Sequence, residues 1–292
     1  MQKHILFTSL IVIFCILIGG SIDVKAQVAR ERYQPGFRFG FNQYRYVIDA
    51  PTAGILDPGY FDTSMRMYAN GGLLGRIHIG LSDKLMFGVS YGGENIIGEG
   101  KVNWNPQPGV NLRLRLYKEN YNVPAVAIGF DSQGYGAFRE NITKEVVSLD
   151  STGAPIIETQ TVNVKRYVIK SKGFYLVFSK NYAFFTNMGV HVGINYSLEN
   201  KDGDNDVSIF TGFDLSLNDE LALVGEFDFA TNDDDKDAFG KGKGYFNLAL
   251  RWGFARDFYL QFAMKNILEN KENVNEPIRE LKIVYIRNIA GR

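Results

Sequence analysis

Charged side chains recur at every second position in several segments of this chain. Arg113 and Arg115 alternate with leucines, and Glu226 and Asp228 are separated by a single phenylalanine. Alternate residues of an extended strand project from the same face, so each pair of charges is expected to share one. Arginines and carboxylates that line a cavity can orient or steer polar and charged solutes. Binding or guiding such a solute is the chemistry that these residues could perform.

The candidate residues fall into a basic group and an acidic group. The basic candidates are Arg38, Arg76, Arg113, Arg115 and Arg251, and the acidic candidates are Asp214, Glu226 and Asp228. If about twelve strands form a ring, most of the basic group faces the acidic group and produces a transverse field inside a pore. Alternatively, the two groups pair across the lumen and plug it, which the position of Arg251 favours. The sequence leaves both interpretations open.

Other patterns bear on catalysis and metal binding. His191 is followed by Val192 and Gly193. A lipid-acting hydrolase that used His191 as its base would need a serine nucleophile two positions later, and Gly193 stands there. We therefore predict no enzymatic activity. Two histidines on distant strands also predict no metal site. The alternating aspartates of the segment NKDGDND resemble calcium ligands, but no bidentate glutamate follows, so a calcium site and a solvated acidic loop both remain open. These calcium candidates are Asp202, Asp204 and Asp206.

Positioning these side chains requires strands, and the two-residue periodicity predicts about twelve of them. The clearest hairpin joins 207–217 to 221–231 through three polar residues. Each arm has about ten residues, enough to cross a bilayer as a tilted strand. The remaining strands are expected at 37–46, 73–81, 84–92, 110–117, 123–131, 173–180, 184–197, 244–254, 258–268 and 278–289.

Short and long connections alternate along the chain, and 132–171 is the longest, with an expected hairpin formed by 145–157 and 159–170. Short periplasmic turns and long extracellular loops are typical of outer-membrane barrels, whereas β-sandwiches lack this alternation. We therefore predict an all-β fold: an up-and-down, antiparallel transmembrane β-barrel. The same alternation of short and long connections is expected to place both termini in the periplasm.

The first 26 residues have the features of a secretory signal peptide, with cleavage expected after Ala26. The apolar run of about 14 residues is short for a membrane anchor, the alternative reading. Residues 27–292 then form the barrel domain, with 30 basic against 31 acidic side chains and no cysteine. This balance indicates no nucleic-acid partner. The expected location is the outer membrane of a Gram-negative bacterium, in contact with its lipid.

Two segments resemble the YjbH-like family of outer-membrane proteins. They are VPAVAIGFDSQGYGAF at 123–138 and FYLVFSKNY at 174–182. The residues that carry the resemblance are Pro124, Gly129, Asp131, Gly134, Gly136, Phe138, Tyr175, Ser179 and Lys180. The resemblance implies a role in exopolysaccharide production or export, with polysaccharide or periplasmic export proteins as partners. Independently of it, Gly134 and Gly136 permit tight backbone turns, and Asp131, Ser179 and Lys180 could lock neighbouring strands together.

Two functions follow from these patterns. The first is a pore or assembly component that passes exopolysaccharide or another polar solute across the outer membrane. The second is a plugged structural or surface-interaction barrel that acts through its extracellular loops, 132–171 above all. Conductance separates the two hypotheses, because only a pore passes ions.

Overall fold

The computed structural model describes residues 44–149, 155–183, 187–235, 237–255, 257–272, 274 and 276–289. Among them, twelve antiparallel strands close into a barrel, because each pairs with a neighbour on both sides and β1 pairs with β15. These strands are β1 (Tyr60–Tyr68), β2 (Gly72–Gly80), β3 (Leu85–Glu94), β5 (Gly109–Tyr117), β6 (Ala125–Asp131), β9 (Gly173–Tyr182), β10 (Met188–Tyr196), β11 (Ser208–Ser216), β12 (Leu221–Asp228), β13 (Tyr245–Ala255), β14 (Phe258–Lys265) and β15 (Ile278–Asn288). The predicted closed all-β barrel is confirmed.

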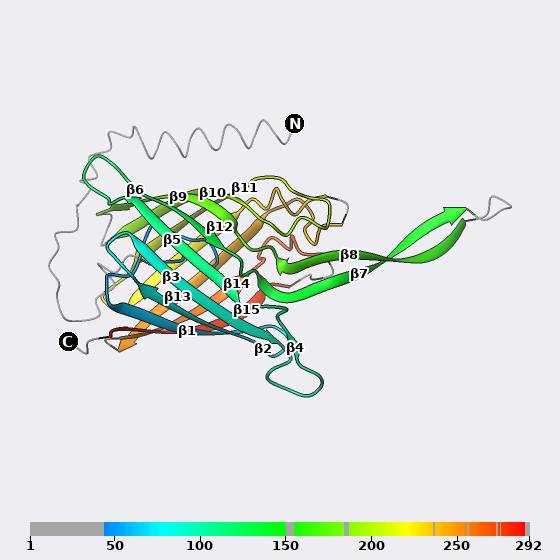
Figure 1. Cartoon of the computed structure of the whole chain (residues 1–292), viewed down its shortest axis with the longest axis horizontal. Coiled ribbons are helices and arrows are strands. Elements are labelled where there is room, and N and C mark those ends of the chain that lie inside the picture. Colours follow the sequence, from blue (N-terminus) through cyan, green and yellow to red (C-terminus); the bar gives the residue numbers. More distant parts are fainter. Residues whose placement is uncertain are drawn as a thin grey trace.

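Three further strands lie outside the ring. The two-residue strand β4 (Asn103–Trp104) pairs with the end of β3, and β7 (Tyr135–Leu149) pairs only with β8 (Pro155–Ile169). Figure 1 shows the β7–β8 hairpin projecting far from one end of the barrel. This hairpin was expected within 132–171, but its arms are longer and its turn falls earlier, since Leu149 pairs with Pro155.

Side-chain alternation sorts the two faces of the barrel wall. On β5, Leu112 and Leu114 are exposed outward, whereas Arg113 is completely buried. On β3, Phe87 and Val89 face outward in the same way. An apolar exterior on a closed barrel matches the lipid-facing band of outer-membrane barrels, where every backbone group must be paired within the protein. In the described part of the chain, no helix has the length and hydropathy to cross a membrane.

The prediction of the first strand was wrong. Residues 37–43, and Arg38 with them, lie outside the described residues, as does the expected signal peptide at 1–26. The next residues do not join the wall, and the strand beside β15 is β1, within the predicted loop 47–72. Asp62, Ser64 and Arg66 of β1 face inward. The strand β1 therefore alternates as the other strands do, but its outward row is less uniformly apolar because it includes Thr63. Consequently, β1 and β2 are joined by a tight turn and not by a long loop.

Residues 44–56, here called the plug segment, fold back inside the barrel. Each of these residues is buried. The segment makes a tight hairpin in which Val47 N donates to Ala50 O and Thr52 N donates to Arg45 O. Small inward residues make room for it: a Cβ at Gly212 would lie 2.8 Å from Val47 Cγ1. Alanines of β6, β12, β13 and β14 pack against the plug segment and complete its apolar contacts.

Candidate functional site

One carboxylate of the barrel wall holds the turn of the plug segment. Glu226 Oε2 accepts hydrogen bonds from three consecutive backbone amides, those of Ile48, Asp49 and Ala50, at 2.9, 2.8 and 2.7 Å. Its other oxygen accepts one from Asn247 Nδ2 at 3.1 Å. Because one oxygen receives all three amide donors, Glu226 is the main attachment point of this turn.

Arginines of the wall hold the carbonyl groups of the same segment. Arg113 Nη1 donates to the carbonyl oxygens of Arg45 and Gly54, both at 2.7 Å. Arg251 Nη2 donates to Tyr46 O at 2.8 Å and also to Val47 O. Guanidinium groups present several donors in a fixed plane, which suits them to bridging carbonyls. The wall therefore binds the plug segment largely through its backbone.

Ion pairs add to this attachment. Arg45 Nε lies 2.7 Å from Asp62 Oδ2. Asp49 pairs with Arg66 at 2.5 Å and with Lys265 at 2.6 Å. Arg66 and Lys265 both also contact Glu280. Each of these charges has an opposite partner within 4 Å, which offsets the cost of burying it.

Some of the predicted lumen residues lie across the ring from one another, whereas Arg251 on β13 lies beside the acidic strand β12. Arg76 and Arg113 lie on β2 and β5, and Glu226 lies on β12 on the far side of the ring. The plug segment occupies the space between them. Arg113 binds its carbonyl groups from one side, whereas Glu226 and Arg251, on the paired strands β12 and β13, bind its amides and carbonyl groups from the other. In this structure a chain segment fills the lumen, which the plugging alternative did not foresee.

The remaining lumen candidates are also engaged. Arg76 stacks over the Tyr46 ring at 4.8 Å and approaches Asp131 at 3.7 Å. Arg115 lies near the turn end, where its Nη2 donates to Asp83 O at 2.8 Å. Asp228 pairs with Lys172.

The structure places a serine beside His191, contrary to the reason given for predicting no hydrolase. Ser179 is the cross-strand partner of His191. His191 Nδ1 lies 2.8 Å from Ser179 Oγ and its Nε2 lies 2.7 Å from Asp214 Oδ2. However, Ala53 N of the plug segment donates to Ser179 Oγ at 2.9 Å and covers it. Because this contact covers Ser179 and both side chains are buried, the array gives no support for a hydrolase, and the lack of enzymatic activity stays a prediction.

Several residues of the family-like motif contact the plug segment or its ligands. Asp131 Oδ2 accepts a hydrogen bond from Tyr46 Oη at 3.0 Å. Tyr175 Oη accepts one from Arg113 Nε at 2.8 Å, and its ring crosses above Gly129. Ser179 binds the plug segment as described, whereas Lys180 Nζ donates to two carbonyls of the β5–β6 turn. Asp131, Tyr175 and Ser179 therefore act mainly on the plug segment, either directly or through Arg113.

The motif also contains Pro124, just before β6, and two glycines near the base of β7. Gly136 has a φ of +76°, in the region that favours glycine. A Cβ at Gly134 would lie 2.5 Å from Tyr167 Cβ. Both glycines thus serve close backbone approach where the β7–β8 hairpin leaves the barrel.

Two of the three calcium candidates are committed to protein contacts. Asp202 binds Arg166 at 2.5 Å and Lys170 at 2.8 Å. Asp204 Oδ2 accepts from Asp234 N at 3.1 Å, and its Oδ1 accepts from Asp206 N at 3.2 Å. Within the described ranges, no group of three or more histidine, cysteine or acidic residues is placed to hold a metal ion. The calcium hypothesis therefore stays a prediction.

Buried polar contacts join the three long loops above the barrel. Arg166, at the base of the hairpin, binds Asp202 of one loop and, at 2.7 Å, Asp233 of another. Glu199 accepts backbone hydrogen bonds from Tyr167 at 2.8 Å and Ser171 at 3.0 Å. Burial raises the pKa of Glu199, more than those hydrogen bonds lower it.

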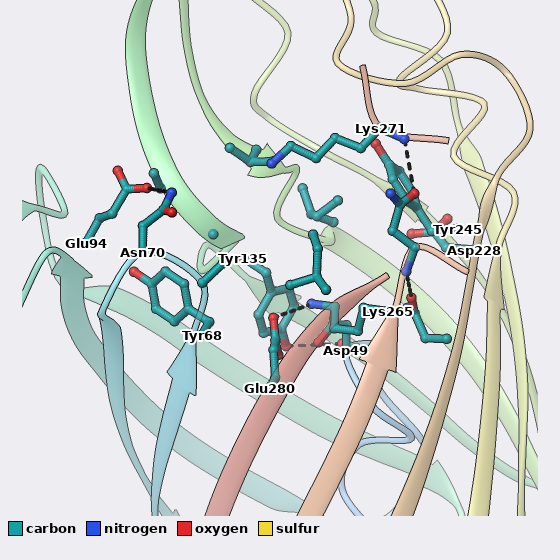
Figure 2. A pocket seen from close by; sticks show the side chains of 18 of the residues that line it. Asp49, Tyr68, Asn70, Glu94, Tyr135, Asp228, Tyr245, Lys265, Lys271 and Glu280 are labelled. Carbon is teal, nitrogen blue, oxygen red and sulfur yellow. Dashed lines mark hydrogen bonds and ion pairs between the residues drawn. The ribbon is translucent and has the colours of Figure 1, made fainter. Parts of the chain in front are cut away.

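A pocket opens at this end of the barrel, above the plug segment. Its lining includes Asp49 of the plug segment, Tyr68, Glu94, Lys265 and Lys271. Figure 2 shows these side chains arranged around the opening, with Lys265 between Asp49 and Glu280. The β14–β15 loop, which carries Lys271, gave no motif signal in the sequence.

Comparison with known proteins gives no family. No family model and no curated protein matches the chain. Among solved structures, it is similar to the KdgM porin, with 11% identity and a TM-score of 0.41 over 77% of this chain and 98% of that one. Similar values hold for the NanC porin (11%, 0.39, 78% and 98%) and for the Acinetobacter baumannii outer membrane protein Omp33 (9%, 0.38, 79% and 98%). Similarities at this level assign neither a family nor a solute to the chain.

Proposed function

We propose that this chain is an outer-membrane β-barrel channel that residues 44–56 hold shut, and that it passes polar solutes when this segment leaves the lumen. The observation that carries the proposal is the binding of the plug backbone from both sides, by Arg113 on one and by Glu226 with Arg251 on the other. These contacts are polar. Removal of the segment would expose charged groups that water can solvate, so an open lumen is a physically accessible state.

The location follows from the wall. A closed barrel with an apolar outer face and no free edge is suited to a bilayer. The exopolysaccharide role implied by the family-like motif is our proposal for the cargo. Asp131, Tyr175 and Ser179 of that motif support it because they are buried inside the barrel and contact the plug segment or Arg113, which binds it.

Deletion of residues 44–56 tests the channel. In planar bilayers we expect the intact protein to conduct rarely and the deletion variant to conduct steadily. Heat-modified migration on denaturing gels checks that the variant has folded. Steady conduction by the intact protein would show that residues 44–56 do not hold the channel shut. If the folded deletion variant is silent, no pore exists.

The exposed hairpin favours a second candidate, a permanently closed barrel that acts through surface contacts. Val147 and Ile157 form a cross-strand pair near its tip and are 67% and 68% exposed. Under this hypothesis, truncation of the hairpin abolishes function while deletion of residues 44–56 has no effect on ion passage.

A further inference from the structure

A pocket lies above the plug segment, between the β1–β2 turn, the base of β7 and the β14–β15 loop. It is open to solvent, and its empty volume, with that opening included, is about 730 Å³. Asp49 of the plug segment forms part of its floor, so a site here rests on the closed state proposed above.

The carboxylates of the pocket already have partners. Glu94 pairs with Arg139 at 3.1 Å and accepts from Asn70 Nδ2 at 2.8 Å. Asp49 and Glu280 share Lys265. The pocket therefore offers little unused acceptor capacity for a cationic ligand.

Two donor groups of the pocket are unused. In the described part of the chain, Asn266 Nδ2 has no hydrogen-bond partner although the residue is only 2% exposed. Its Oδ1 accepts from Lys271 N at 3.0 Å, which leaves the NH₂ group as the free end. Lys271 Nζ likewise makes no hydrogen bond or ion pair with a described residue, and Figure 2 shows its side chain reaching across the pocket.

The electrostatic setting of Lys271 favours an anion. Burial lowers its pKa, and the nearby positive charge of Arg139 lowers it further, more than Glu94 raises it. A negative ligand group beside the ammonium would relieve both effects. One ammonium with one amide suits a carboxylate, which carries a single charge, whereas a phosphate usually collects more cations.

An aromatic ring completes the lining. Tyr68 lies partly exposed at the pocket, and its ring occupies space that a side chain at residue 72 would take, since a Cβ at Gly72 would lie 2.1 Å from it. A fixed aromatic ring offers an apolar face with a polar hydroxyl at its edge, which suits a sugar ring.

We propose that this pocket binds a carboxylate-bearing sugar, such as a hexuronic acid unit, with the carboxylate on Lys271 and Asn266 and the ring against Tyr68. Binding here would place an acidic saccharide directly above the plug segment. The ligand could be a free sugar acid or a unit of an acidic polymer.

Calorimetric titration of the full chain in detergent micelles tests the site. We expect glucuronate to bind and glucose, which lacks the carboxylate, to bind at least about tenfold more weakly, as the loss of one charged hydrogen bond implies. Lys271→Gln should weaken glucuronate binding by a similar factor. The matched control is Lys101→Gln, on an exposed loop, which should bind as the wild type does. An oligomeric glucuronan binding more tightly than the monomer would identify a polymer as the ligand, and equal affinity a free acid.

Three outcomes would overturn the proposal. They are no heat with glucuronate, equal affinity for glucose, and a Lys271→Gln variant, folded by gel migration, that matches the control. Tyr68→Leu separates a sugar site from a simple anion site: it should weaken glucuronate but not acetate, and equal binding of glucuronate by both proteins would overturn the sugar assignment. Calorimetry measures binding whether or not the barrel conducts ions. A missing sugar site would therefore be distinguished from an error in the proposed gating by residues 44–56.

Discussion

Glu226→Ala is the sharpest perturbation of the closed state. It removes the single acceptor of three plug amides, those of Ile48, Asp49 and Ala50. In the closed lumen these amides would then be buried without a partner. When the segment leaves the barrel, water can satisfy them, so the substitution acts on the balance between closed and open states.

The size of the effect follows from the contacts. An unsatisfied buried amide costs about 1–3 kcal/mol, so three of them destabilise the closed state by at least about 3 kcal/mol. Since about 1.4 kcal/mol is a factor of ten, the ratio of open to closed molecules should rise at least about 150-fold. Glu226→Gln keeps one acceptor oxygen and should lie between this variant and the wild type.

Single-channel recording in planar bilayers measures that ratio as open probability. Glu220→Ala is the matched control, because Glu220 lies in the exposed turn of the same β11–β12 hairpin. An open probability for folded Glu226→Ala equal to that of Glu220→Ala would refute the reasoning. It would mean that these hydrogen bonds do not hold the lumen shut.

Three further predictions concern the loops. Arg166→Gln leaves the buried Asp233 without its cation and Asp202 with Lys170 alone, at a cost of about 3–5 kcal/mol. Limited trypsin digestion should therefore cut the loops much faster while the barrel stays intact, and an unchanged rate would contradict this. Because the folded-state pKa of Glu199 is raised, the folded state binds its proton more tightly than the unfolded state does. Loop stability should therefore fall as pH rises from the ordinary carboxyl pKa to the raised one, and hydrogen exchange should show this in the wild type but not in Glu199→Gln. Replacing 143–160 by a short turn should leave heat-modified migration unchanged, because the residues described at 143–148 and 155–160 are mostly exposed. Loss of the folded band would show that the hairpin supports the barrel.

Alternation is a local property, and this is why the sequence predicted the wall well. Leu112 and Leu114 against Arg113 define two faces without reference to any other strand, and the structure confirms both faces. The same reasoning misassigned the start of the barrel. The aromatic alternation of 37–46 is stronger than that of β1, but the strand that pairs with β15 and β2 is β1.

The candidate site was predictable only as a set of inward charges. Glu226 and Arg113 were named from periodicity, yet their partners are backbone groups of residues 44–56, which no spacing rule connects to them. Ser179 and His191 are twelve positions apart and meet because β9 and β10 pair in one register. A motif search along the chain could not find that contact.

The sequence by itself determined which residues face lipid and which face the lumen, because a two-residue period fixes the side of a strand on which each side chain lies. Only the tertiary structure decided what the lumen contains. Ring closure brings Glu226 and Arg113 to opposite walls at a separation that a folded segment can span, and residues 44–56 supply the amides and carbonyls that satisfy both. Burying charges requires partners, and here the chain itself provides them.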